Sequence, residues 1–389
     1  MGGNLKIKKS TKPTTMKLTI LKEKLNEGLK LNEKIAKKTL ALPILENCLL
    51  ETEKNFLKIS STNLETGINY WGLAKIEKEG KICVPAKILT QIINLLPLEK
   101  INLFEENFVL KIEDENYKTQ INGVSPEEFP IIPQPESIKP FILDSLSFCE
   151  ALSSVSKIPM PSSARPEISG ILVSFKENFV EMVATDSFRL ASKKIFFSEN
   201  FSEKISFILP QVSAREFLNI FSQEKGEIKI YYSPSQVWFE TQMEETDHPK
   251  IQYTSRLIEG EYPNYEEIIP KKFGTQIEVL KEEFLKHVKT ASLLSGKNNE
   301  IRFKIDPQKE IIQILSQTPN LGRYESSIKG KVRGDEIEIV FNWKFLIDGI
   351  TEIDTERFIF SFTSVEGPAM IKPLEKEDYF YILMPIKTV

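Results

Sequence analysis

Apolar and polar positions along this chain change repeatedly between a helical period and a strand-like period. Residues 280–294 carry apolar side chains three and four positions apart, which predicts an amphipathic helix. The same spacing predicts helices over residues 21–38 and 143–157. Runs such as ISGILVSFKENFVEMVAT, from Ile168, predict pairs of strands joined by polar turns. The pattern indicates a chain of mixed helices and antiparallel strands.

Two further features recur at a common interval of roughly 125 residues, which predicts three structural repeats. The first is a polar turn after an apolar strand, found at Thr62, Thr185 and Thr318. The second is a strand that runs directly into a helix, found at Pro85, Pro210 and Asn342. Each repeat is predicted to contain an opening helix, a strand pair, the polar turn, another strand, a second helix and two finishing strands.

Two proline-rich connectors, residues 125–137 and 259–272, separate the repeats. Proline lacks an amide proton and fixes its φ angle, so these segments are expected to be linkers rather than central strands. The expected domains are residues 16–137, 138–273 and 274–389. Ahead of them, residues 1–15 carry four lysines and no acidic residue. We expect this leader to be disordered; the alternative is a basic arm that contacts nucleic acid.

Composition narrows the class of protein. Hydrophobic residues make up 41% and charged residues 27% of the chain, as in soluble globular proteins, and no apolar run is long enough to span a membrane. Neither of the two histidines has a second histidine or a cysteine nearby, and the common phosphate-binding and nucleophile motifs are missing. We therefore expect no metal, no cofactor and no catalytic activity. The three cysteines lie in apolar runs, which predicts buried free thiols and suits a reducing cytoplasm.

The repeats carry short strings whose order and spacing resemble those of the bacterial sliding clamp, the DNA polymerase III beta subunit. These strings are LPIL at Leu42–Leu45, RPEISGILVSF from Arg165, VATDSFRLA from Val183, YPNYEEIIP from Tyr262, TPNLG from Thr318, FNWKFLIDGI from Phe341 and YFYILMP from Tyr379. The resemblance covers residues 16–389. It implies an α+β fold of three clamp domains, each with two helices packed on antiparallel sheet. It also implies a head-to-tail homodimeric ring that encircles duplex DNA and serves as processivity factor of the replicative polymerase.

The stretch VATDSFRLA has three interpretations. Asp186 and Arg189 could belong to an active site, but no histidine or cysteine lies nearby, and the matching turns have Asn63 and Pro319 in place of the carboxylate. The stretch could also be only a turn between strands. The resemblance implies a third role, in a hydrophobic cleft that binds short linear peptides of polymerase, clamp loader and repair proteins. By position, this cleft comprises Ile168, Thr185, Ser187, Phe188, Arg189, Leu190, Pro263, Glu267, Ile268, Pro368, Ile382, Met384 and Ile386.

Three cleft positions depart from the family pattern, and the ending PIKTV also differs from the usual form. Ser187 and Phe188 replace a common Gly-His pair, and Glu267 stands where a basic residue is common. These departures imply a cleft that prefers a different, less acidic peptide.

Binding to DNA conflicts with the net charge of −4, because ordinary DNA-binding proteins are basic. An encircling ring needs only a mildly positive inner surface. The residues expected to face DNA are Lys34, Lys37, Lys38, Lys87, Arg165, Arg215, Lys286, Lys289 and Lys297. Arg165 and Lys87 match family positions that contact DNA, whereas Gln211 and Val212 stand where the family often has basic residues. The alternative function is a clamp-fold scaffold that binds partner peptides without encircling DNA.

Overall fold

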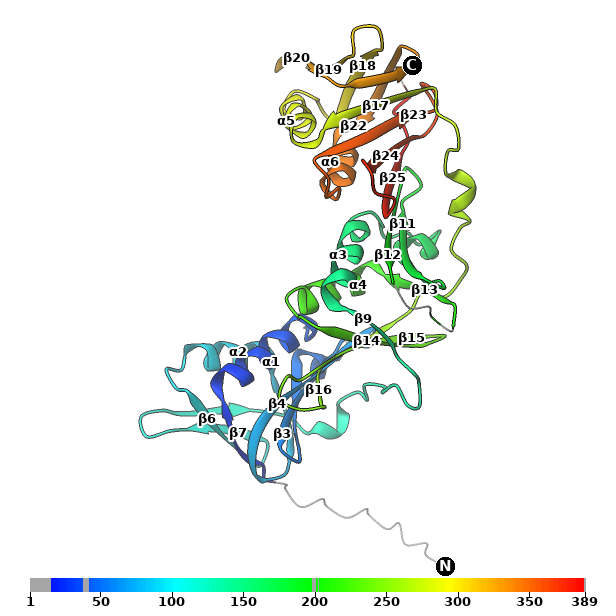
Figure 1. The fold of residues 1–389 in the computed structure, drawn as a ribbon. Helices are drawn as coiled ribbons and strands as arrows, with labels where there is room; N and C mark the ends of the chain where they lie inside the picture. The colour runs from blue at the N-terminus through cyan, green and yellow to red at the C-terminus, as the bar shows by residue number, and fades with distance from the viewer. Residues whose placement is uncertain (1–14, 38–41, 198–200, 202, 388–389) are drawn as a thin grey trace, which may run out of the picture. The chain divides into compact units, whose positions relative to one another are not determined.

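The computed structural model describes residues 15–37, 42–197, 201 and 203–387 (Figure 1). The predicted leader, apart from Thr15, lies outside the described residues. The chain divides into two compact units, residues 1–146 with 219–256 and residues 147–218 with 257–389. We call these the first unit and the second unit, and each is described by itself.

The six predicted helices are confirmed. They are α1 (Lys22–Ile35), α2 (Ala86–Leu95), α3 (Ser145–Ser156), α4 (Gln211–Phe221), α5 (Lys281–Ser292) and α6 (Trp343–Thr351). Each follows directly on a strand, so the chain turns from sheet to helix without a loop. At the start of α6, the Asn342 side chain accepts a hydrogen bond from the Lys344 amide at 3.0 Å, which satisfies one of the free amides of the first turn.

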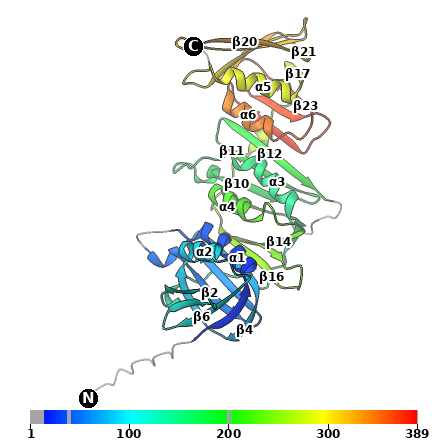
Figure 2. The same cartoon turned by 90° about the vertical axis from the view of Figure 1, so that its left-hand side faces the viewer.

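The first unit is built on one antiparallel sheet, whose main path runs β8-β7-β6-β1-β4-β16-β15-β14-β9. Its strands are β1 (Lys17–Leu21), β2 (Asn47–Glu53), β3 (Phe56–Thr62), β4 (Thr66–Lys78), β5 (Lys81–Pro85), β6 (Lys100–Glu106), β7 (Val109–Glu113), β8 (Lys118–Asn122), β9 (Phe141–Asp144), β14 (Glu227–Ser233), β15 (Gln236–Gln242) and β16 (Pro249–Arg256). Helices α1 and α2 lie side by side, and α1 packs on β3 and β4 (Figure 2).

The second unit contains two antiparallel sheets, of order β13-β10-β11-β12-β25-β24-β23-β17-β21 and β20-β19-β18-β22. Its strands are β10 (Gly170–Phe175), β11 (Phe179–Thr185), β12 (Arg189–Phe196), β13 (Ile205–Pro210), β17 (Thr275–Leu280), β18 (Glu300–Asp306), β19 (Ile311–Thr318), β20 (Gly322–Lys329), β21 (Lys331–Gly334), β22 (Ile337–Asn342), β23 (Arg357–Phe362), β24 (Ala369–Pro373) and β25 (Tyr379–Leu383). Helices α5 and α6 pack on each other and against these strands.

The prediction of two finishing strands per repeat is wrong, because each repeat ends in three: β6–β8, β14–β16 and β23–β25. Strand β8 has the polar sequence KTQIN and buries only Ile121, since it lies at a sheet edge. Strand β16 buries Gln252, Thr254 and Ser255 among polar neighbours. Strand β8 lacks the apolar alternation by which strands are recognised in a sequence, and in β16 only Ile251 and Tyr253 show it.

Two strand pairs join consecutive expected domains into continuous sheets. In the first unit β4 pairs with β16, with Tyr70 opposite Ile251. In the second unit β12 pairs with β25, with Leu190 opposite Ile382. A partner more than 180 positions away cannot be read from local sequence pattern, and neither pairing was predicted.

Close packing of helix on strand is achieved in both units by glycine against tyrosine. A Cβ atom at Gly28 of α1 would lie 2.3 Å from the ring of Tyr70, and one at Gly349 of α6 would lie 2.4 Å from the ring of Tyr381. Both contacts are too short for any residue larger than glycine. The two tyrosines lie on β4 and β25, the strands that join consecutive expected domains.

The predicted buried free thiols are confirmed at Cys48, Cys83 and Cys149. Burial raises the pKa of both the Cys48 and the Cys83 thiol to about 12, so these thiols stay protonated and unreactive. Among the helices of the described residues, none combines the length and the apolar character that a bilayer crossing requires.

Candidate functional site

The stretch VATDSFRLA forms a tight turn between β11 and β12 that is held by its own side chains. The Thr185 hydroxyl donates to the Arg189 carbonyl at 2.8 Å and accepts from the Ser187 amide at 3.2 Å. One oxygen of Asp186 accepts from the amides of Phe188 and Arg189, each at 3.0 Å. Ser187 adopts a left-handed φ of 75°, which lets the chain reverse.

The turn between β3 and β4 repeats this geometry. The Thr62 hydroxyl donates to the Thr66 carbonyl at 2.7 Å, Leu64 has a φ of 76°, and Asn63 accepts from the amides of Glu65 and Thr66. An amide oxygen therefore serves the turn as well as a carboxylate oxygen does. The charge of Asp186 is not needed for the turn itself.

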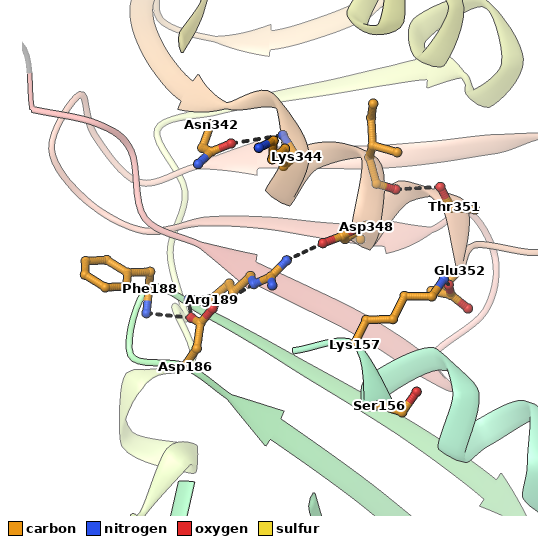
Figure 3. Close-up of polar contacts among 12 residues, drawn as sticks. Ser156, Lys157, Asp186, Phe188, Arg189, Asn342, Lys344, Asp348, Thr351 and Glu352 are labelled. Carbon is orange, nitrogen blue, oxygen red and sulfur yellow. Dashed lines mark hydrogen bonds and ion pairs between the residues drawn. The ribbon is translucent and has the colours of Figure 1, made fainter. Parts of the chain in front are cut away.

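That charge is used to hold Arg189. The second oxygen of Asp186 lies 2.9 Å from Nε of Arg189, and the same guanidinium reaches Asp348 of α6 at 2.5 Å (Figure 3). The guanidinium also lies 4.3 Å from the ring centroid of Phe345. Arg189 is only 7% exposed, so it braces β12 against α6 and presents little surface to a ligand.

A second ion pair links the same helix to α3. Lys157, just after α3, lies 2.7 Å from Glu352, just after α6 (Figure 3). The Lys157 side chain is 51% exposed, so water screens the pair and it contributes little stability by itself. Together with the Arg189 brace, it fixes α6 relative to the β11–β12 turn.

A groove of about 610 Å³ opens beside the turn. Its lining consists of Ser187, Phe188, Asn342, Phe345, Met384, Pro385, Ile386 and Lys387. Phe188 is 63% exposed and Met384 is 38% exposed, although both are large apolar residues. The Met384 amide donates to the Phe188 carbonyl at 2.9 Å, so the chain after β25 is tied to the turn. The groove is mainly apolar with a few polar groups, as expected for a site that takes a short peptide.

The predicted cleft residues separate into three groups in the structure. Ser187, Phe188, Met384 and Ile386 line the groove. Ile168, Thr185, Arg189, Leu190 and Ile382 are buried, and two of them, Leu190 and Ile382, pack with Val183 and Tyr265 in one cluster. Pro263, Glu267 and Ile268 lie on the linker around the short helix η4 (Tyr265–Ile268), and Pro368 is half-buried before β24.

Sequence reasoning missed four groove residues: Asn342, Phe345, Pro385 and Lys387. Asn342 is predicted from the sequence only as the start of a helix. Phe345 lies one turn further along α6, so the helical spacing after Asn342 was the available signal.

The residues predicted to face DNA occur on both units. Lys87, Arg215, Lys286, Lys289 and Lys297 are exposed. Lys34 is exposed, but its ammonium donates to the Asn219 carbonyl at 2.6 Å near the end of α4. Lys37 is exposed, and Lys38 lies outside the described residues.

Arg165 differs from these cations because it is engaged at the β11–β12 turn. Its guanidinium lies 3.3 Å from the Ser187 hydroxyl and 3.3 Å from Glu167. On α4, Gln211 is buried and donates to the Ser156 carbonyl at 3.0 Å, while Val212 is 59% exposed. The exposed face of α4 therefore carries the apolar Val212 beside the cation Arg215.

Comparison with known proteins decides the family. Three family models of the DNA polymerase III beta subunit match in order, the N-terminal domain over residues 16–133, the central domain over 144–264 and the C-terminal domain over 266–387. The chain belongs to the DNA polymerase III beta subunit family. This membership confirms the fold class, three clamp domains of helices and antiparallel sheet.

Relatives and solved structures of the family align over nearly the whole chain. The beta sliding clamps of Synechocystis and Synechococcus elongatus are 24% and 26% identical, over 96% of this chain and 100% and 99% of theirs. The sliding clamp structure from Bacillus subtilis superposes with a TM-score of 0.91 at 24% identity, over 97% of this chain and 100% of that chain. A Pseudomonas aeruginosa clamp bound to griselimycin gives 0.88 at 22% identity, over 96% of this chain and 100% of its own.

Proposed function

We propose that this chain is a sliding clamp and processivity factor of the replicative DNA polymerase. Two copies join head to tail as a ring around duplex DNA, and the ring tethers the polymerase to its template. The observation that carries this proposal is the ordered match of all three family domains over residues 16–387. The alignment of curated beta sliding clamps over 96% of the chain supports the same function.

Free sheet edges support ring closure. Strand β8 ends the sheet of the first unit, and β20 ends the four-stranded sheet of the second unit. Exposed apolar side chains accompany both edges: Phe108, 46% exposed, in the hairpin before β8, and Leu293, 74% exposed, after a helix that packs on β20. Pairing between copies would cover these side chains and remove two open edges.

The groove supports partner binding. Its exposed apolar residues, Phe188 and Met384, can supply the anchors that a short peptide needs. Met384 is flexible, which allows one groove to accept different side chains. We propose that polymerase, clamp-loader and repair proteins reach the clamp here, with the buried members of the predicted cleft forming its floor.

The protein is proposed to be non-catalytic. Asp186, the carboxylate of the β11–β12 turn, accepts hydrogen bonds from two backbone amides and pairs with Arg189. Among the described residues, no group of histidine, cysteine and acidic side chains could hold a metal ion. The protein is proposed to act by encircling DNA and tethering the polymerase, and this role requires no catalysed reaction.

The second candidate function is a peptide-binding scaffold that does not encircle DNA. The exposed helix faces favour it in one respect, because Ile88 and Leu95 on α2 and Val212 on α4 are exposed apolar residues. A surface that faces duplex DNA would attract the phosphates more strongly with cations at these positions.

Retention on circular DNA tests the proposed ring. Labelled clamp is loaded onto nicked circles with the matching clamp loader, and gel filtration follows at low and moderate salt, before and after linearisation. A topological clamp stays on the circle at both salt concentrations and leaves when the circle is cut. Loss with salt but not with cutting would instead indicate an ordinary electrostatic binding face. No association at any salt would favour the scaffold.

A further inference from the structure

A second cavity, of about 550 Å³, lies in the second unit away from the groove. It is formed by the hairpin that joins β10 to β11, by β12, by β25 and by the linker around η4. Four lysines from separate segments line it: Lys176, Lys194, Lys204 and Lys271. No role for this cavity follows from the clamp function.

The acid at the floor of the cavity is already satisfied. Glu181, 6% exposed, accepts from the Ser192 hydroxyl at 2.7 Å and from the Tyr265 hydroxyl at 2.9 Å. Burial and the adjacent Glu181 raise the pKa of Tyr265, so the phenol remains a neutral donor. Lys194 lies 4.0 Å from the same carboxylate. Glu181 is thus part of the floor of the cavity, and its hydrogen bond to Tyr265 holds the linker to β11.

Two of the lysines are available to a ligand. Lys204 lies 3.6 Å from Glu177, whereas Lys176 and Lys271 make no ion pair within the part of the chain that the structure describes. The lining holds four lysines and three glutamates, Glu177, Glu181 and Glu266, so its formal charge is +1 (4 − 3), and it attracts a bound anion. The cavity therefore favours a ligand with negative charge.

The other lining residues limit how many negative charges the ligand can carry. Glu177 and Glu266 also line the cavity, and they would repel a polyanion such as a nucleic-acid backbone. Lys194 lies 5.1 Å from the ring centroid of Phe179 and the ring of Phe196 packs against it at 5.7 Å, which leaves little of the Phe179 ring for a base to stack on. Phe380 and Ile269 add apolar surface. One carboxylate beside an apolar side chain matches this lining.

The cavity and the predicted cleft share one face of the sheet. Residues 190, 192 and 194 of β12 point to the same side, because side chains alternate along a strand. Leu190 belongs to the cluster beneath the cleft, and Lys194 lines the cavity. Phe188, the exposed groove residue just before β12, lies six residues from Lys194, roughly 20 Å along an extended chain. A peptide anchored in the groove could span this distance with about six extended residues.

We propose that this cavity is an accessory subsite of the clamp, which binds a partner segment carrying one carboxylate next to an apolar side chain. The assignment rests on the proposed peptide-binding function. The first test does not depend on the groove. Acetyl-Asp-Leu-amide and acetyl-Asn-Leu-amide are each added to the full-length chain, and saturation-transfer NMR reports contact with the leucine methyl groups.

Two double variants test the contribution of the two available lysines. K176Q/K271Q removes both of their charges, while the control K272Q/K372Q removes two charges that do not line the cavity. The aspartyl peptide should give at least about threefold more transfer than the asparaginyl peptide on wild type and on the control. This preference should vanish on K176Q/K271Q. Equal transfer from both peptides on wild type, or an unchanged preference on K176Q/K271Q, would overturn the subsite.

The second test measures the link to the groove. A polymerase C-terminal peptide is extended by Gly-Ser spacers of two to eight residues and then Asp-Leu, and its affinity is measured by fluorescence anisotropy. We expect a gain of about fivefold over the Asn-Leu version at one spacer length, abolished by K176Q/K271Q and reduced by salt. Absence of any gain would overturn the accessory role.

Two other outcomes are distinguishable. If the unextended peptide fails to bind wild type, the proposed groove function is wrong, while the dipeptide result still decides the cavity. If oligodeoxythymidylate displaces acetyl-Asp-Leu-amide from wild type, the cavity takes nucleic acid, and the peptide assignment is overturned.

Discussion

Replacement of Arg189 by methionine tests whether this residue is a brace or a peptide contact. Methionine keeps much of the buried length of the side chain but removes the charge. The substitution leaves Asp186, whose side chain is 5% exposed, without its counter-ion. Asp348 is affected less, because its side chain is 36% exposed and water can replace the lost partner.

The expected loss of local stability is about 3 kcal/mol. Breaking a buried ion pair from one side costs roughly 3–5 kcal/mol. The lower end applies here because Asp186 keeps two amide donors. The cation–π contact with Phe345 adds about 1 kcal/mol at most, and water around Asp348 offsets a similar amount. Since about 1.4 kcal/mol is a factor of ten, opening of the turn should become about a hundredfold more frequent.

Hydrogen exchange followed by mass spectrometry measures this opening in the full-length chain. Peptides covering residues 183–192 and 343–351 should lose about a hundredfold in protection in R189M. R302M is the matched control, because Arg302 pairs with Glu338 at the surface, with side chains 46% and 41% exposed. Its effect on peptides covering β18 should stay below about fivefold.

The turn in the first unit supplies a rescue. Asn63 accepts two amide hydrogen bonds there without a charge, so D186N should keep the turn while removing the stranded carboxylate. The double variant D186N/R189M should therefore recover at least about tenfold in protection relative to R189M. No recovery would show that an uncompensated charge is not the cause. Unchanged protection in R189M together with lost peptide binding would refute the brace and make Arg189 a ligand contact.

Three further outcomes are expected. L293E should convert the dimer to a monomer in sedimentation equilibrium, because it replaces an exposed apolar side chain of the proposed interface with a charged one. An intact dimer would locate the interface elsewhere. Removal of residues 384–389 should lower peptide affinity at least about tenfold in calorimetry while β25 stays paired, and equal affinity would reject the groove. L64G should stabilise the first unit by about 1 kcal/mol in thermal unfolding, because Leu64 has a φ of 76°; a lower midpoint would contradict the strain.

The helices could be predicted because their apolar spacing is strong and local. The core residues of α5, Phe284, Leu285 and Val288, fall on the face that the spacing identified. The landmark turns at Thr62 and Thr185 could also be predicted, since the threonine that marks each turn holds it by a hydrogen bond. The third polar turn, at Thr318, differs, because the Thr318 hydroxyl donates instead to the Leu294 carbonyl after α5.

The missing strands and the sheet junctions depend on tertiary structure. Gln252 of β16 donates to Glu240 and accepts from Asn69, so its polar side chain is buried in a hydrogen-bonded row across the first unit. A sequence pattern treats such a residue as exposed, because burial of a polar group requires partners that lie far along the chain. The pairing of β12 with β25 has the same origin.

The site was predicted in part for a related reason. The sequence placed Ser187, Phe188 and Met384 together only through resemblance, since no local rule brings the chain end to a turn almost 200 residues earlier. The role of Arg189 was not foreseen, because Asp348 is its partner on α6. The repeats nevertheless contain the clue. Equivalent turns carry Asn63 and Asp186 with the same amide contacts, so the extra charge of Asp186 must serve something outside the turn. Differences between structurally equivalent repeats thus separate what the fold requires from what one site adds.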